Sequence, residues 1–124
     1  MKLHPQHTGN ANIIRAYDER GVTVNDEVYH GSLVVSRSLL LTPWEVGDAD
    51  SLQAADLLAL LQYQPEIILL GTGQRHRMCD PRISAEVMQH GTGIEIMSTD
   101  AACRTYNVLL GEDRNVLAAL IIGS

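Results

Sequence analysis

Two stretches of the chain are apolar at every position and predict strands that are buried on both faces. Ile67–Leu70 reads Ile-Ile-Leu-Leu, and Val116–Ile122 also contains no polar residue. Unbroken runs of leucine and β-branched residues are typical of central strands in a sheet that is covered on both sides. Ile94–Met97 is a further segment of strand length and is apolar except at Glu95. The pattern therefore predicts a sheet with Ile67–Leu70 at its centre.

Three segments alternate with these strands and repeat apolar residues at steps of three and four, which predicts helices. Their ends carry capping side chains, proline in the first turn or glycine after the last turn. The expected helices run from Asp50 or Ser51 to about Gln62, from Asp80-Pro81 to Gly91, and from Ser98, Thr99 or Asp100 to Gly111. Their expected inner faces are Leu52, Ala55, Leu58 and Leu61 or Gln62; Ile83 and Val87; and Ala102, Tyr106 and Leu109.

The first third of the chain carries short strand patterns separated by turn residues. Ile13–Tyr17 and Val22–Val24 flank a turn-rich segment, and Val28 and Tyr29 follow a second turn. Such spacing predicts two consecutive hairpins, that is, a β-meander.

Two more apolar runs, Ser32–Ser36 and Leu39–Leu41, end where Pro43 removes a hydrogen-bond donor from the strand. Residues 1–11 show no periodicity, so we expect an irregular start. The order of strands and helices predicts one α/β domain over residues 1–124, with a mixed sheet covered by helices.

Length and charge narrow the class of protein. A chain of 124 residues suits one domain and buries roughly two-thirds of its unfolded surface, which is enough for a core. The formal net charge of −6 argues against nucleic acid as a partner, because such binding needs a basic surface. Cys79 and Cys103 are too few for a disulfide framework. With no signal-peptide pattern and no apolar run of about eighteen residues, we expect a cytoplasmic protein without membrane insertion.

The turn Gly71-Thr72-Gly73 follows the central strand and precedes a loop that contains Arg75 and Arg77. The residues match neither a phosphate-binding loop nor a dinucleotide fingerprint. One interpretation is a tight strand exit that needs positive φ. The other is a crevice for a small anion, with the glycines, the arginines and the helix start at Thr99 around it. Asp100 could instead satisfy that helix start.

Cys103 lies in the first turns of the third expected helix, beside Arg104. The helix dipole and the guanidinium could lower the pKa of the thiol and make it a nucleophile, and Arg104 could also contribute to the anion crevice. Burial as a small apolar residue next to Ala102 is the alternative, which we favour. His76-x-x-Cys79 and His4-x-x-His7 are each only half of a metal site, so we expect no metal and no cofactor.

Polar residues near the end of the third helix suggest structural contacts. Arg114 could pair with Glu112 or reach a backbone carbonyl at the helix end. Asn107 and Thr105 lie on a helix whose inner face is otherwise apolar, so their side chains could satisfy backbone groups of the sheet.

The segment from Ile94 to Ile122, together with Gly71-Thr72-Gly73 and Pro43-Trp44, resembles a small domain family. The signature positions are Thr99, Ala102, Cys103, Thr105, Asn107, Glu112 and Arg114. This family includes the adipogenesis-associated domain protein of animals, the mitochondrial complex I assembly factor three and many uncharacterised bacterial and archaeal proteins. Two positions depart from it: Ser98 replaces aspartate, and Asp113 replaces glycine, which suggests that this turn does not need positive φ.

The resemblance implies a compact three-layered α/β domain, in which helices and an N-terminal β-meander pack on a central mixed sheet. It implies binding of an unknown protein partner rather than catalysis. Our leading hypothesis is thus a binding or assembly module, a monomer or weak dimer, with a possible ligand site at Gly71, Thr72, Gly73, Arg75, Thr99 and Arg104. The alternative is a small enzyme on an acidic substrate with Cys103 or Asp100 as the reactive group.

Overall fold

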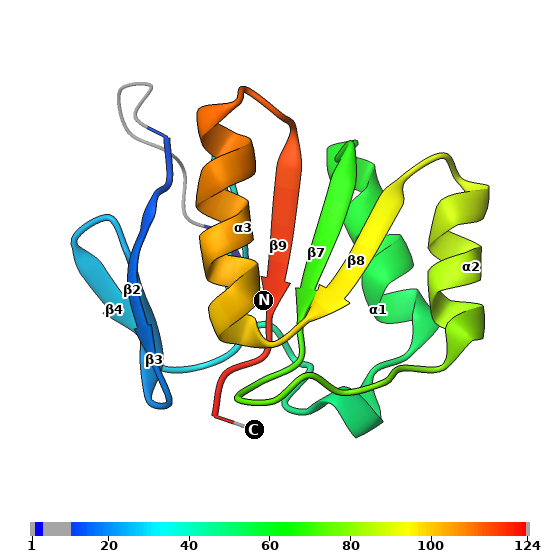
Figure 1. Cartoon of the computed structure of the whole chain (residues 1–124), viewed down its shortest axis with the longest axis horizontal. Helices are drawn as coiled ribbons and strands as arrows, with labels where there is room; N and C mark the ends of the chain where they lie inside the picture. The colour runs from blue at the N-terminus through cyan, green and yellow to red at the C-terminus, as the bar shows by residue number, and fades with distance from the viewer. Residues whose placement is uncertain (1, 4–10, 124) are drawn as a thin grey trace.

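A computed structural model describes residues 2–3 and 11–123 of the chain (Figure 1). Its centre is a six-stranded sheet with the order β1-β6-β5-β9-β7-β8. The parallel pairs are β9 with β7 and β7 with β8, and the other pairs are antiparallel, so the sheet is mixed as predicted. The strands are β1 (Lys2–Leu3), β5 (Leu33–Ser36), β6 (Leu39–Thr42), β7 (Ile67–Gly71), β8 (Gly93–Met97) and β9 (Val116–Leu120).

The two continuously apolar segments form the middle of this sheet. β9 and β7 pair in parallel from Ile67↔Val116 to Gly71↔Leu120. Every residue of β9 is buried, as are the last four residues of β7. The prediction of central strands is confirmed, because each face of both strands packs into a separate hydrophobic cluster.

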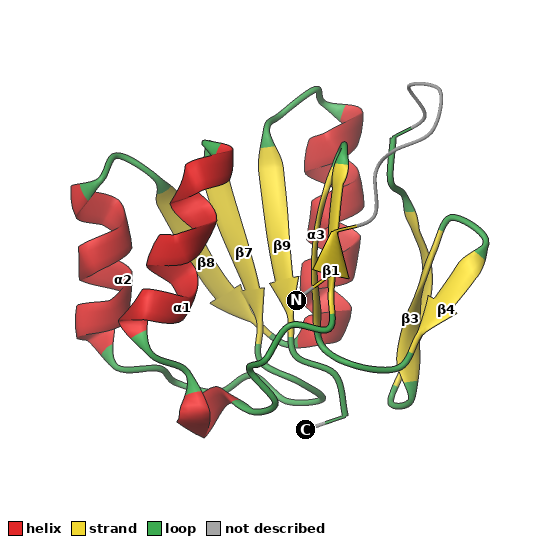
Figure 2. Cartoon of the chain, turned by 180° about the vertical axis from the view of Figure 1, so that it is seen from behind, coloured by secondary structure: helices red, strands yellow, loops and turns green. Residues whose placement is uncertain are grey.

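Helices cover both faces of the sheet (Figures 1 and 2). α1 (Ala54–Leu58), continued by a 3₁₀ turn over Ala59–Tyr63, and α2 (Pro81–Gln89) pack on one face. α3 (Thr99–Gly111) packs on the other face. This confirms the three-layer arrangement of the predicted α/β domain.

Local sequence explains where α2 begins and ends. Asp80 accepts a hydrogen bond from the N–H of Arg82 at 3.0 Å, and Pro81 occupies the first helical position. Gly91 follows the helix with a φ of 86°, a conformation that glycine adopts without strain. Ile83 and Val87 are the buried residues of this helix, as its spacing predicts.

The first helix begins later than predicted. Neither Asp50 nor Ser51 caps it; both belong to a 3₁₀ turn, Ala49–Ser51, which Asp48 caps. The N–H of Gln53 donates to the carboxylate of Asp56 at 2.8 Å, and the α-helix starts directly after Gln53. The predicted start is therefore wrong, whereas the helical residues run on from Ala54 through the 3₁₀ turn to Tyr63, close to the predicted end.

The predicted meander is present as a second, three-stranded sheet beside α3: β2 (Ile14–Asp18), β3 (Gly21–Val24) and β4 (Glu27–Tyr29). Asn107 on α3 binds both backbone groups of Ile14, with its amide donating to the carbonyl at 2.6 Å and its oxygen accepting from the N–H at 3.1 Å. The hydroxyl of Tyr106 donates to the carbonyl of Asn12 at 2.8 Å. Asn107 thus satisfies backbone groups as predicted, but those of the meander rather than of the central sheet.

Contacts at the end of α3 differ from the predictions. Arg114 pairs with Glu66 at 2.7 Å rather than with Glu112. The carbonyl of Leu110 at the helix end accepts from Arg37 at 2.9 Å. Asp113 has a φ of 60°, so the turn has positive φ although the sequence suggested that it does not need it.

The start of the chain also differs from the irregular segment that we expected, because Lys2 and Leu3 pair with Thr42 and Leu41 of β6. Residues 4–10 lie outside the described residues. Within the described part of the chain, no helix has the length and apolar character needed to cross a membrane. The cytoplasmic location stays a prediction.

Candidate functional site

The predicted Gly71–Gly73 turn meets the start of α3 directly. A Cβ atom at Gly71 would lie 2.8 Å from the hydroxyl oxygen of Thr99 and 2.9 Å from its Cα, so this approach requires glycine. Gly73 has a φ of 106°, which also favours glycine. Gly71 therefore provides space and Gly73 provides conformation for the close packing of strand and helix.

The side chain of Thr99 joins the turn to the end of β9. Thr99 is fully buried, and its hydroxyl donates to the carbonyl of Ile121 at 2.7 Å while it accepts from the N–H of Gly73 at 2.9 Å. The N–H of Thr99 in turn donates to the carbonyl of Gly73 at 2.8 Å. The two walls of the predicted crevice are thus adjacent, and hydrogen bonds join them directly. We call this region, Gly71, Gly73, Thr99 and Ile121, the glycine junction.

Thr72 orders the loop that follows the glycine junction. Its buried hydroxyl donates to the carbonyl of Arg75 at 2.6 Å and accepts from the N–H of Arg77 at 3.1 Å. These bonds lie within one loop and satisfy a hydroxyl that would otherwise be costly to bury. Thr72 therefore has a structural role in the position where we predicted a ligand contact.

Ion pairs engage two of the three arginines between residues 74 and 82, namely Arg77 in the loop and Arg82 at the start of α2. Arg77 lies 3.4 Å from Asp50, and Arg82 lies 2.8 Å from Asp80. Within the described residues, no ion pair is recorded for Arg75. Arg75 is therefore the loop residue whose cation is available to an anion.

The start of α3 offers few free donors to such an anion. Ser98 is its N-cap and accepts from the N–H of Ala101 at 3.3 Å, while the N–H of Thr99 is bound to the glycine junction. Arg104 pairs with Asp100, one turn away on the exposed side of the helix. Of the six predicted ligand residues, the structure brings Gly71, Thr72, Gly73 and Thr99 together, and engages Arg104 elsewhere.

Cys103 is buried on the inner face of α3. Burial and, to a smaller extent, the charge of Asp100 raise the pKa of its thiol to about 12, and Arg104 only partly opposes this increase. The expectation of a lowered pKa is therefore wrong, because desolvation outweighs the guanidinium and the helix dipole. The favoured interpretation, a small buried residue beside Ala102, is confirmed.

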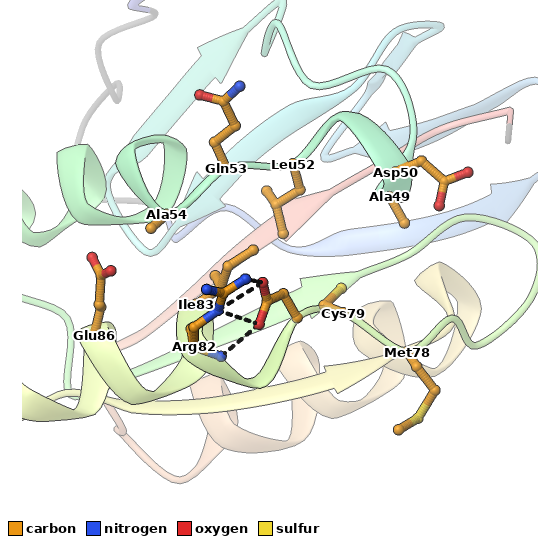
Figure 3. A pocket seen from close by; sticks show the side chains of 11 residues that line it. Ala49, Asp50, Leu52, Gln53, Ala54, Met78, Cys79, Arg82, Ile83 and Glu86 are labelled. Carbon is orange, nitrogen blue, oxygen red and sulfur yellow. Dashed lines mark hydrogen bonds and ion pairs between the residues drawn. The ribbon is translucent and has the colours of Figure 1, made fainter.

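A groove that the sequence did not reveal lies between the start of α1 and the start of α2 (Figure 3). It has a volume of about 510 Å³ and is lined by residues from two segments, 49–54 and 78–86. Leu52 and Ile83 are almost fully buried beneath it, while Met78 at its rim is 87% exposed. We call it the α1–α2 groove.

Charged side chains also line the α1–α2 groove. The carboxylates are those of Asp50, Asp80 and Glu86, and the guanidinium is that of Arg82. The guanidinium of Arg82 donates to the carboxylate of Asp80 at 2.8 Å, and Figure 3 shows Arg82 with its hydrogen bonds as dashed lines. One signal in the sequence could have indicated that the two lining segments meet: residues 45–56 hold four acids and no base, and Asp50 among them pairs with Arg77 of the arginine-containing loop.

The half-sites for a metal acquire no further ligands in the described residues, where no group of three His, Cys, Asp or Glu side chains is placed to hold an ion. His76 and Cys79 are among these described residues. His4 and His7 lie outside the described residues.

Two relatives with established names have sequences that are similar to this chain. The chain is 33% identical over 111 residues to "NADH dehydrogenase [ubiquinone] 1 alpha subcomplex assembly factor 3" of Danio rerio, covering 88% of the chain but only 63% of that relative. It is 33% identical over 94 residues to the "13 kDa major membrane protein" of Francisella tularensis, covering 75% of the chain and 76% of the relative.

A solved structure and a family match extend this similarity over almost the whole fold. The NMR structure of a Xanthomonas campestris protein superposes with a TM-score of 0.83 at 36% identity, covering 99% of this chain and 93% of that one. Residues 14–121 match the family described as "Protein of unknown function (DUF498/DUF598)". The resemblance noted from the sequence is therefore confirmed, and the chain belongs to this family.

Proposed function

We propose that this chain is a binding module that assists the assembly of a larger protein complex through direct protein contacts. The observation that carries the proposal is the 33% identity, over 88% of the chain, to a protein named as an assembly factor of NADH dehydrogenase. Because the chain spans 63% of that relative, we transfer only what the shared domain can do, which is to bind.

The chemistry of the reactive groups supports binding over catalysis. An enzyme that uses Cys103 would need the thiolate, and burial raises the pKa of this thiol to about 12. The other candidate, Asp100, is exposed and pairs with Arg104 on the surface of α3. Neither group has the environment that activates a nucleophile or a general base.

A small anion at the Gly71–Gly73 turn is a finer part of the proposal. The support for it is the charge of Arg75, for which the described residues provide no ion pair, in the loop that the hydroxyl of Thr72 orders. The hydrogen bonds of Thr72, Gly73 and Thr99 weigh against it, because an anion would have to compete with them. Arg75 is thus the residue on which this part of the proposal depends.

Affinity capture tests the assembly role. The tagged chain is isolated from native lysate, and copurifying proteins are quantified by mass spectrometry against the tag alone. We expect enrichment of several subunits of one complex, and native gels should place them in intermediates that are smaller than the finished complex. Enrichment of no protein above the tag control across growth conditions would contradict the proposal.

A further inference from the structure

The α1–α2 groove combines an apolar floor with an adaptable rim. Leu52 and Ile83 are 7% and 8% exposed, so the small remaining apolar surface of each faces the groove that they line. Cys79 is half-buried and packs against the same hydrophobic cluster. Met78 is almost fully exposed at the rim, and methionine is common at binding surfaces because its flexible thioether adapts to different partners. A partner can therefore cover apolar side chains here that water now contacts.

The charges of the groove favour a cationic partner. Three carboxylates and one guanidinium line it, and the guanidinium of Arg82 is already held by Asp80 through bonds of 2.8 and 3.1 Å. Asp50 has only a loose contact with the exposed Arg77, at 3.4 Å. In the described part of the chain, no ion pair engages Glu86.

Other ligand classes fit these charges less well. A nucleic acid or a dicarboxylate would face uncompensated carboxylates, and the whole chain carries a formal charge of −6. A volume of about 510 Å³ exceeds one side chain and is sufficient for a short segment of a partner.

We propose that the α1–α2 groove docks a segment of a partner protein that places an apolar side chain over Leu52 and Ile83 and a lysine or arginine beside Glu86. The carboxylate of Asp50 lies in the same lining and extends the attraction. Electrostatic complementarity of this kind selects a partner and fixes its register, while the apolar contact supplies the buried surface. The inference rests on the proposed binding function and gives it a surface and a partner chemistry.

Selection of peptides tests the docking site. A displayed library of short random peptides is panned against the intact chain, and synthetic copies of the enriched peptides are titrated by fluorescence anisotropy. We expect the enriched peptides to share an apolar residue close to lysine or arginine. Glu86→Lys should weaken their binding about tenfold or more, because it replaces attraction by repulsion, and Met78→Ser should weaken it less.

Two matched variants serve as controls. Glu112→Lys makes the same charge change at an exposed acid outside the groove, and Met88→Ser makes the same truncation at a half-exposed methionine of α2 that does not line it. Binding should be unchanged in both, and thermal melting checks that all four variants are folded. The inference is overturned if repeated panning enriches no peptide, if the enriched peptides lack basic residues, or if Glu86→Lys binds them as well as Glu112→Lys does.

The capture experiment separates failure of this inference from failure of the proposed function. If the wild-type chain and Glu86→Lys recover the same partner equally, the chain is a binding module whose contact surface lies elsewhere. If the wild type recovers no partner although the enriched peptides bind the groove as expected, the assembly role fails and the docking site stands.

Discussion

The loop over residues 74–80 connects the glycine junction to the α1–α2 groove, and the two regions have opposite character. The junction contains glycines and hydroxyls of the kind that sequence motifs highlight, yet its polar atoms bind one another. The groove is lined by ordinary leucine, isoleucine, methionine and glutamate, yet it is open. Unusual residues can therefore mark a place where elements pack closely, while the accessible surface lies next to it.

This difference has a physical origin. A glycine that lacks space for a Cβ atom brings backbone and side chain within hydrogen-bond distance, which consumes donors and acceptors instead of offering them to a ligand. The α1–α2 groove lies between the start of α1 and the start of α2, whose lining residues are far apart in the sequence. Its lining depends on how these elements meet rather than on any motif.

Substitution of Gly71 should give the largest effect. In Gly71→Ala the new Cβ would lie 2.8 Å from the hydroxyl oxygen of Thr99 and 2.9 Å from its Cα, so helix and strand must separate. We expect a loss of about 2–3 kcal/mol in the free energy of unfolding, as for other overpacked sites, measured by urea denaturation.

Gly111→Ala is the matched control, since a Cβ there meets nothing within 4 Å and the residue lies in α3. It should leave stability unchanged or raise it by up to about 1 kcal/mol, because alanine is the better helix former. Equal stability of Gly71→Ala and the wild type would show that the junction is looser than its contacts indicate.

The reactivity of the two cysteines allows the regions to be compared, since Cys103 is buried in α3, one turn after Thr99, and Cys79 is half-exposed at the groove. Burial raises both pKa values, that of Cys103 to about 12. Because the thiolate is the form that reacts, the high pKa and the burial of Cys103 both slow its labelling. We expect iodoacetamide to label Cys79 at least about 100-fold faster than Cys103 in the native state, as measured by mass spectrometry. In Cys79→Ser, labelling should become slow until denaturant is added.

Labelling of Cys103 at the rate of a free thiol would reverse this conclusion and restore the enzyme alternative. The sign of the pH dependence gives a second check. Because the pKa of the Cys103 thiol is raised above its usual value, the fraction of thiolate in the folded chain increases only as the pH approaches about 12. A rate that rises and levels off near pH 7 is incompatible with the buried site.

Much of the fold follows from local signals. Continuous apolar runs identified β7 and β9, and the sequence Asp80-Pro81 with Gly91 defined the limits of α2. These signals are local: a helix cap and an unbroken apolar strand are each specified by residues that lie within or directly beside the element itself.

Features that depend on distant partners were not predictable. β5 pairs with β9 across more than eighty residues of sequence, from Leu33↔Leu120 to Ser36↔Leu117, and nothing in either strand specifies the other. Arg114 has an acid two residues away but pairs with Glu66, which the sheet brings close. For the same reason the groove was missed, because its two lining segments become neighbours only through the packing of α1 against α2.

The smallest expected effect concerns the anion proposed at the junction. Phosphate at a concentration equal to its dissociation constant would stabilise the chain by about 0.4 kcal/mol, which is roughly 1–2 °C in melting temperature. Arg75→Ala should abolish this rise, because the described residues give Arg75 no ion pair that would compete for its charge. Arg15→Ala, at an exposed arginine of the meander, should retain it. If phosphate raises the melting temperature of all three proteins equally, or of none, the glycine junction is a packing contact without a ligand, and the groove is the better candidate for recognition.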